Sequence, residues 1–410
     1  MSSFRYENIY ELTPLIKVFM KRSVIGLLCC VLTLLSKPGI TQTDGSCGLR
    51  ISVLTCSPGQ DLYSLFGHNA LRIIDTFKTA YGYKLEDSIY NWGTFNFNEP
   101  NFYFKFMRGK LLYFLSPDRL QDFMYEYQYE GRSVTEQVLN LSCAEKLKIK
   151  QLVGINMNGD NRFYKYDFLF DNCTTRIRDI IEKNVSGMKV TGSLVPTGTT
   201  FRNMLYSYLD KGSQPWSKLG IDILLGSEID KPVTNDQSMF LPEYLMKAVD
   251  SSSANNIPIV SNKHLLVTGQ PYDEMKDLYK PLITISFICI AFFMLSLLKN
   301  TNAKKIVKFT DTLLLYVTGL IGLLILFMWF FTDHKACSNN YNIAWALPTN
   351  FIAAFAAWKR PSWVKQYFKI AAGITALLLL TWFWLPQEMN IALLPFTLYM
   401  LYRYVKLVNV

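Results

Sequence analysis

The sequence predicts an α+β domain followed by an all-α transmembrane bundle of about five helices. Three observations support this: short strand-like and helix-like segments before residue 275, a series of apolar runs after it, and Lys/Arg clusters at alternate ends of those runs. Half of the 410 residues are hydrophobic and only 18% are charged, whereas about a quarter is usual in soluble domains. This composition excludes a disordered chain and argues against a purely soluble enzyme. The net charge of +10 lies beside apolar runs, so it indicates membrane topology and not nucleic-acid binding.

The N-terminal segment has the features of a signal peptide. The apolar run Ser23–Ser36 is about 14 residues long and follows Lys21 and Arg22, which is short for a membrane span. The small residues around Gly39 form only a weak cleavage site. We therefore expect residues 1–41 to be a signal peptide or an N-terminal anchor, residues 42–275 to be a periplasmic domain, and residues 276–410 to be the transmembrane domain.

The middle region alternates strand-like and helix-like segments. Strands are predicted at 50–55, 70–75 and 88–97, an extended segment at 164–170, and connecting stretches at 255–258 and 267–271. Ser142 and Glu145 form the pattern of a capping box, which predicts a helix start. A second helix is expected to begin at Cys173, with Asp171 or Asn172 as its N-cap, and further helices at 201–209 and 242–249.

The C-terminal region contains five apolar runs: Pro281–Leu298, Leu313–Phe331, Ile343–Trp358, Ile370–Leu385 and Ile391–Val405. Lysines and arginines gather after the first, third and fifth runs. By the positive-inside rule, the middle region lies outside and the C-terminus lies in the cytoplasm. Pro348 and Asn350 predict that the third run is broken or re-entrant.

Histidine and cysteine limit the possible chemistry. The three histidines are His68, His264 and His334; a lone histidine in a strand is most often structural, and the other two fit surface or membrane-interface positions. Five cysteines fall in the expected oxidising compartment, namely 47, 56, 143, 173 and 337, so at least one thiol is unpaired within the chain. Cys173 is the best candidate, because a helix N-terminus favours a thiolate, although a half-cystine or a buried inert thiol remains open. No metal-ligand motif and no phosphate-binding glycine loop occurs, so no cofactor is predicted.

Several motifs together resemble one family. These are Leu54–Gly59, Tyr63–Arg72 with Gly-His-Asn, Tyr90–Phe95, Phe168–Arg176 with Asp-Asn-Cys-Thr, Gly220–Gly226, Met239–Leu245, Asp333-His334 and Trp345–Pro348. They resemble the Lnb-type lipoprotein N-acyltransferases of Bacteroides and relatives, with a periplasmic domain similar to permuted papain-like folds of the NlpC and lecithin:retinol-acyltransferase type.

The resemblance implies a role for individual residues. Cys173 is implied as the nucleophile and His68 as its base. A third polar residue orients the imidazole in such sites, and Asn91 is our first choice for it, with Asn69 and Asn172 as alternatives. Tyr63, Asn69, Asn172 and His334 are further candidates for substrate binding.

The resemblance also implies a reaction. An acyl chain of a membrane phospholipid passes to Cys173 and then to the α-amino group of the diacylglyceryl-cysteine of an apolipoprotein, at the bacterial inner membrane, with no cofactor and no nucleic acid. The alternatives are a membrane-anchored cysteine peptidase acting on cell-wall peptides, a non-enzymatic scaffold and a lipid hydrolase. The aromatic runs Phe102–Met107 and Tyr113–Leu115 are expected to be core, with an acyl groove or an interfacial segment as the alternative.

Overall fold

The computed structural model describes residues 47–270, 277–359 and 361–409. The expected signal peptide or anchor, residues 1–41, lies outside them. Every element described below lies in one compact unit, residues 48–410.

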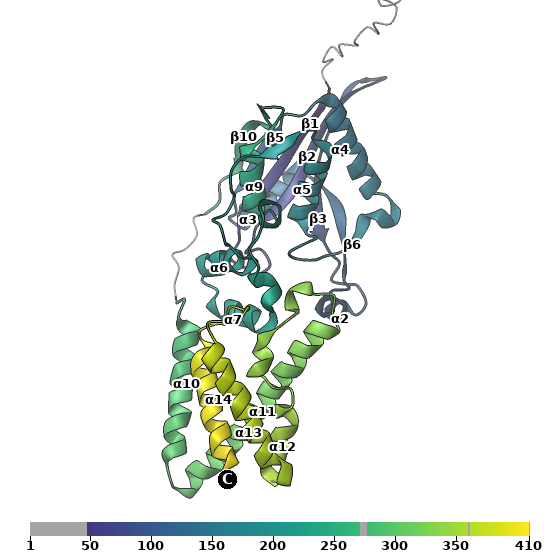
Figure 1. The fold of residues 1–410 in the computed structure, drawn as a ribbon. Coiled ribbons are helices and arrows are strands. Elements are labelled where there is room, and N and C mark those ends of the chain that lie inside the picture. The colour runs from purple at the N-terminus through teal and green to yellow at the C-terminus, as the bar shows by residue number, and fades with distance from the viewer. Residues whose placement is uncertain (1–46, 271–276, 360, 410) are drawn as a thin grey trace, which may run out of the picture. The chain divides into compact units, whose positions relative to one another are not determined.

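A seven-stranded antiparallel sheet forms the centre of the N-terminal domain (Figure 1). Its order is β10 (Val260–Val267), β5 (Val134–Leu139), β1 (Leu49–Cys56), β2 (His68–Thr79), β3 (Gly82–Thr94), β4 (Leu112–Arg119) and β6 (Phe163–Lys165). The three predicted strands are β1, β2 and β3. β1 is central and buried along almost its whole length, as its apolar composition requires.

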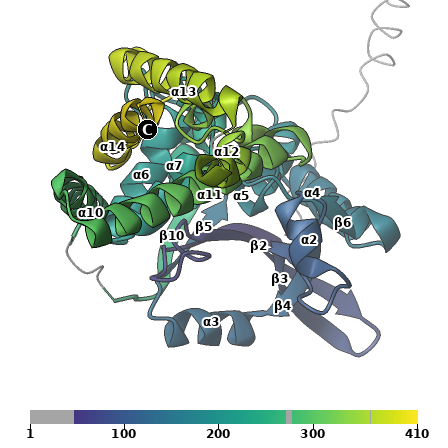
Figure 2. The same ribbon diagram turned by 90° about the horizontal axis from the view of Figure 1, so that it is seen from below.

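Helices cover both faces of this sheet. α4 (Cys143–Asn156), α5 (Cys173–Asn184) and α9 (Pro242–Ser251) pack on one face, and α3 (Leu120–Tyr129) packs on the other (Figure 2). Under α3, Phe123 and Tyr127 are buried against Leu54 and Ile89 of the sheet. The predicted starts of α4 and α5 are confirmed: both have capping boxes, with Ser142 and Asn172 as the N-caps.

The segment before the membrane differs from its prediction. A small sheet pairs β7 (Met188–Val190), β8 (Ser252–Ala254) and β9 (Ile257–Pro258), and β10 completes the large sheet beside β5. The connecting stretch expected at 255–258 is therefore partly strand. The chain leaves the domain only after β10, because this edge strand supplies the backbone hydrogen-bond partners on the outer side of β5.

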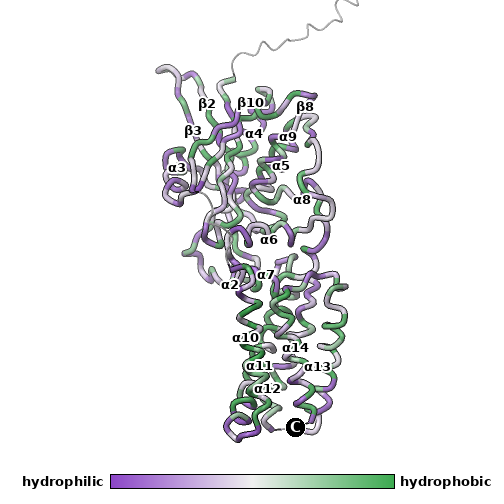
Figure 3. Tube along the Cα trace, turned by 90° about the vertical axis from the view of Figure 1, so that its left-hand side faces the viewer, coloured by the Kyte–Doolittle hydropathy of each residue, from purple (hydrophilic) through white to green (hydrophobic). Residues whose placement is uncertain are grey.

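Beyond residue 277 the described chain is helical and largely hydrophobic (Figure 3). The helices are α10 (Lys280–Leu297), α11 (Thr301–Phe330), α12 (Asn350–Lys359), α13 (Ser362–Thr381) and α14 (Leu393–Val408). In this described part, α10, α11 and α13 are long and apolar enough to cross a membrane. The α+β and all-α parts are thus confirmed, whereas five spans and a papain-like topology stay predictions. The third run is broken: α12 begins after Pro348, and the short helix η4 (Tyr341–Ala344) precedes it.

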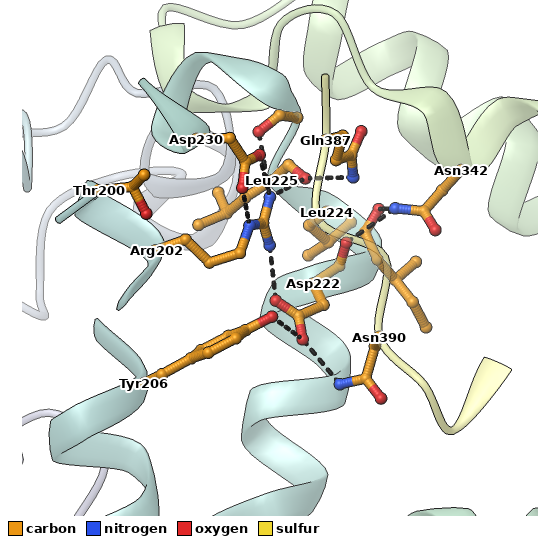
Figure 4. Close-up of polar contacts among 12 residues, drawn as sticks. Thr200, Arg202, Tyr206, Asp222, Leu224, Leu225, Asp230, Asn342, Gln387 and Asn390 are labelled. Atoms are coloured by element: carbon orange, nitrogen blue, oxygen red, sulfur yellow. Dashed lines mark hydrogen bonds and ion pairs between the residues drawn. The ribbon is translucent and has the colours of Figure 1, made fainter. Parts of the chain in front are cut away.

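A buried polar network fastens the two regions together (Figure 4). It starts on α6 (Phe201–Lys211), where Arg202 contacts Asp222 of α7 (Pro215–Leu224) at 2.6 Å and Asp230 at 2.7 Å. The second carboxylate oxygen of Asp222 accepts hydrogen bonds from Tyr206 at 2.8 Å and from Asn390, in the loop before α14, at 2.7 Å. Because Arg202 and Asp222 are almost completely buried, these contacts fix the domain to the helices in one arrangement.

The aromatic run Phe102–Met107 forms the short helix α2, which contains no buried residue. The expectation that this run is core is therefore wrong. Phe104 and Phe106 are 52% and 54% exposed and Tyr103 is 80% exposed. The sequence cannot separate core from interfacial aromatic residues, because both are apolar runs of the same length.

Candidate active site

Cys173 and His68 meet where β2 begins and β1 ends. Cys173 is the first residue of α5, which packs on β2 and β3, and His68 is the first residue of β2. The Cys173 side chain is buried, and it lies close enough to His68 for each group to shift the pKa of the other. Gly67 makes this arrangement possible, since its φ is +81° and a Cβ atom there would lie 2.7 Å from the carbonyl oxygen of Cys56.

The pair is electrostatically coupled. Burial alone would raise the pKa of the Cys173 thiol, but the positive charge of His68 and the hydrogen bonds from His68, the Asn69 backbone and Thr174 outweigh it. The pKa is lowered from 9.0 to about 7. For His68, burial lowers the pKa, and the charge and hydrogen bond of Cys173 together with the Asn91 contact raise it more, so the net shift is upward. The Cys173 thiol is therefore partly ionised near neutral pH.

Asn91 hydrogen-bonds the imidazole of His68, and Asp118 hydrogen-bonds Asn91. The Oδ1 atom of Asn91, on β3, lies 3.0 Å from Nε2 of His68. The Nδ2 group of Asn91 donates to Oδ2 of Asp118, on β4, at 2.6 Å. Because the amide nitrogen is used by the carboxylate, Oδ1 must face His68 and accept from Nε2–H. This leaves Nδ1 free to take a proton from the thiol.

The two alternative orienters serve the fold. The buried Asn69 side chain donates to Thr55 Oγ1 at 2.8 Å and to the Leu54 carbonyl, so only its backbone N–H faces Cys173. Asn172 is the N-cap of α5, and its amide donates to the carbonyl oxygens of Phe168 at 2.8 Å and Phe240 at 2.9 Å. Neither side chain reaches His68 by a hydrogen bond among the contacts of the described residues.

The remaining predicted residues lie away from this cluster. Tyr63 is 77% exposed, and its hydroxyl lies 3.5 Å from Glu130. His334 lies in the loop that follows α11, with Nε2 3.3 Å from the carbonyl oxygen of Phe106 in α2. His264 is exposed on β10. The structure thus brings Cys173, His68 and Asn91 together and leaves Tyr63 and His334 outside that cluster.

The cysteines separate into two groups. Cys47 and Cys143 are disulfide-bonded, whereas Cys56, Cys173, Cys289 and Cys337 are free thiols and buried. Burial raises the pKa of Cys56 to about 12, the opposite of the shift at Cys173. Among the free thiols described outside the membrane helices, Cys173 alone has a pKa lowered toward neutrality, because the charge of His68 outweighs the effect of burial there.

Asp118 is the site residue that the sequence did not reveal. The stretch Ser116–Arg119 contains Pro117 and reads as a turn, whereas it is the end of β4, paired with β3. An aspartate next to proline is an ordinary turn signal. Only the pairing of β3 with β4 places its carboxylate beside Asn91, and no local pattern encodes that pairing. The described residues contain no group of three or more His, Cys, Asp or Glu side chains placed to bind a metal.

Fold and site together define a class: a protein with a helical membrane region and an α+β domain that holds an activated thiol next to a histidine. The family comparison agrees with it. The model of the Lnb N-terminal periplasmic domain matches residues 41–207, and that of the Lnb transmembrane domain matches residues 273–410. The chain belongs to the Lnb family and is a membrane protein with a periplasmic domain. No curated protein and no solved structure shows significant similarity to it.

Proposed function

We propose that this protein is a lipoprotein N-acyltransferase in which Cys173 is the nucleophile, His68 the general base and acid, and Asn91 the orienting residue. The observation that carries the proposal is the lowered pKa of the Cys173 thiol beside His68. Family membership supports it, and so does a membrane region that keeps the domain at the surface where both lipid substrates are held.

The first half-reaction forms a thioester. The Cys173 thiolate attacks the ester carbonyl of a phospholipid, and His68 gives its proton to the departing glycerol oxygen as the C–O bond breaks. The capping box of α5 uses the N–H groups of Asn172 and Thr175. The N–H groups of Cys173 and Thr174 at the helix start are therefore placed to hold the negative oxygen of the tetrahedral intermediate.

The second half-reaction moves the acyl group to nitrogen. The α-amino group of the diacylglyceryl-cysteine of an apolipoprotein attacks the thioester, His68 takes a proton from that amine, and the Cys173 thiolate leaves. The order of events gives ping-pong kinetics. The product is an amide, which is more stable than the thioester, so the transfer runs forward.

Location at the bacterial inner membrane, with the C-terminus in the cytoplasm, follows from the same proposal. Extraction of a lipid chain into water would cost about 0.8 kcal/mol for each CH₂ exposed. A catalytic domain fixed to membrane helices by the Arg202–Asp222 network avoids this cost, because it meets the ester at the bilayer surface.

The test is the acyl-enzyme. Purified protein is incubated with phospholipid, quenched in acid and digested, and the peptide that contains Cys173 is weighed. We expect this peptide to carry a fatty-acyl mass that hydroxylamine removes. The mass should be absent in Cys173→Ala and strongly reduced in His68→Ala. Added diacylated lipoprotein should then accept the label. Active, folded protein that never carries an acyl mass would refute the transferase and favour the peptidase alternative.

A further inference from the structure

An aromatic strip runs from the candidate nucleophile to the exposed helix α2. We define it as six residues that contact one another in sequence: Tyr166, Tyr113, Phe95, Phe97, Phe102 and Phe106. Ring centroids are 4.4 Å apart for Tyr166 and Tyr113, 5.2 Å for Tyr113 and Phe95, and 4.8 Å for Phe95 and Phe97. Phe102 then lies 5.1 Å from Phe97 and 6.3 Å from Phe106.

The inner end of this aromatic strip reaches Cys173. A Cβ atom built on Gly93 would lie 3.8 Å from the ring of Tyr166 and 3.9 Å from Cβ of Cys173. Gly93 stands in a bulge of β3 with φ +98°, so it carries no side chain between the thiol and the first ring. The strip is thus continuous with the site.

The outer end lies at the surface of the membrane. α11 rises about 33 Å from Lys308 to Phe330, which matches the roughly 30 Å hydrocarbon core of a bilayer. Asp333, three residues beyond that end, donates its backbone N–H to the carbonyl of Arg108 at 3.0 Å. α2 is therefore held beside the outer end of a membrane helix (Figure 1).

The composition of α2 fits an interfacial position. Phe97, before the helix, is 70% exposed, and Tyr103, Phe104 and Phe106 are each more than half exposed. Lys105 lies within the helix, and Arg108 and Lys110 follow it. Aromatic rings beside cations are the usual arrangement of segments that lie in the headgroup region of a membrane.

We propose that the aromatic strip binds one acyl chain of an outer-leaflet phospholipid and guides it to Cys173, with α2 seated in the headgroup region. The inference rests on the proposed function for the reaction at Cys173. Three observations favour this occupant: α2 is held beside the outer end of a membrane helix, the rings of the strip are apolar, and its inner ring lies next to Cys173.

Photocrosslinking tests the lipid contact without catalysis. Benzoylphenylalanine replaces Phe97 or Phe104 in a Cys173→Ala background, in nanodiscs that contain phospholipid alone. The matched control is the same group at Tyr83, which is 78% exposed on β3 beside the β2–β3 turn. We expect at least tenfold more phospholipid adduct at positions 97 and 104 than at position 83. Equal labelling, or no adduct at either position, overturns the proposal.

Kinetics test the guiding role. Phe97→Ser should raise KM for a long-chain phospholipid at least tenfold and leave acylation of Cys173 by a short-chain, water-soluble ester unchanged, because the site itself is untouched. Equal effects on both donors would overturn the guiding role. If position 97 gives phospholipid adducts but the protein with Cys173 never forms an acyl-enzyme, the lipid contact stands and the proposed function is refuted. The failure of the lipid contact and the failure of the proposed function can thus be told apart.

Discussion

Removal of the His68 imidazole should deactivate the Cys173 thiol by a predictable amount. The pKa of Cys173 is about 7 and that of an ordinary cysteine is 9.0, a difference that corresponds to roughly 3 kcal/mol in favour of the thiolate. His68 supplies the leading favourable contributions to this shift, while burial opposes it. In His68→Ala only burial and the weaker hydrogen bonds remain, so the pKa should rise above 9.0. Cys56 illustrates the direction, since burial raises its pKa to about 12.

The assay is alkylation by iodoacetamide as a function of pH, read by mass spectrometry on the peptide that contains Cys173. About half of the wild-type thiol is ionised at pH 7, and in His68→Ala about 1% or less, so the rate at pH 7 should fall at least about 50-fold. The wild-type inflection near pH 7 should move above 9.

The matched control is His264→Ala, which removes an exposed histidine from β10 and should leave the profile unchanged. A wild-type inflection near 9, or a His68→Ala profile that coincides with wild type, would refute the argument that His68 activates Cys173. Because the readout uses a soluble reagent, it is independent of lipid binding and of the identity of the acyl acceptor.

Three further predictions follow from other contacts. Asn91→Ala should lower the rate of acyl-enzyme formation about 10²-fold, and Asp118→Asn should lower it less, both at unchanged donor KM, as measured by single-turnover acylation. Gly67→Ala should destabilise the domain by about 1–3 kcal/mol, because it places a Cβ on a left-handed backbone position, 2.7 Å from the carbonyl oxygen of Cys56. Thermal unfolding would show this loss, and an unchanged Tm would contradict it. Arg202→Met leaves Asp222 buried without its cation and should cost about 3–5 kcal/mol, seen as earlier unfolding of the periplasmic domain in a thermal melt.

Local signals in the sequence were sufficient where a few adjacent residues decide the structure. The capping-box pattern at Ser142 and the expected N-cap at Asp171 or Asn172 predicted the starts of α4 and α5, and the apolar runs predicted the C-terminal helices. The predicted helix start made Cys173 a candidate thiol, whereas a lone histidine in a strand is most often structural, and His68 became its partner through the family resemblance. The pairing of these two elements came from the family resemblance.

Features that depend on distant partners were missed. β4 contains Pro117 and β10 follows a turn-rich stretch, so neither resembles a strand until its partner is known. Asp118 was missed with β4. The exposure of α2 was missed for a different reason: an aromatic run is buried by protein in a core and by lipid at an interface, and the sequence pattern is the same in both cases.

The loop after α11 is a second connection between the domain and the membrane helices. Residues 332–338 follow α11 and contact both halves of the domain: Asp333 bonds α2 through the Arg108 carbonyl, and the Ala336 carbonyl accepts from the N–H of Gly226 after α7. These contacts fix the domain relative to the outer end of α11. A change in this loop should therefore lower the reaction with lipid substrates without changing the reactivity of the Cys173 thiol.

Gly109→Val tests this coupling. Gly109 has φ +67°, and a Cβ there would lie 3.3 Å from the side chains of Asp333 and His334, so valine should push the loop away from α2. We expect acylation by membrane phospholipid to fall by up to about 10²-fold while the alkylation profile of Cys173 stays the same. Gly82→Val is the matched control, because Gly82 also has a positive φ but nothing lies within 4 Å of its Cβ position. Equal losses in both variants would assign the effect to backbone strain, and the loop would then have no part in placing the site.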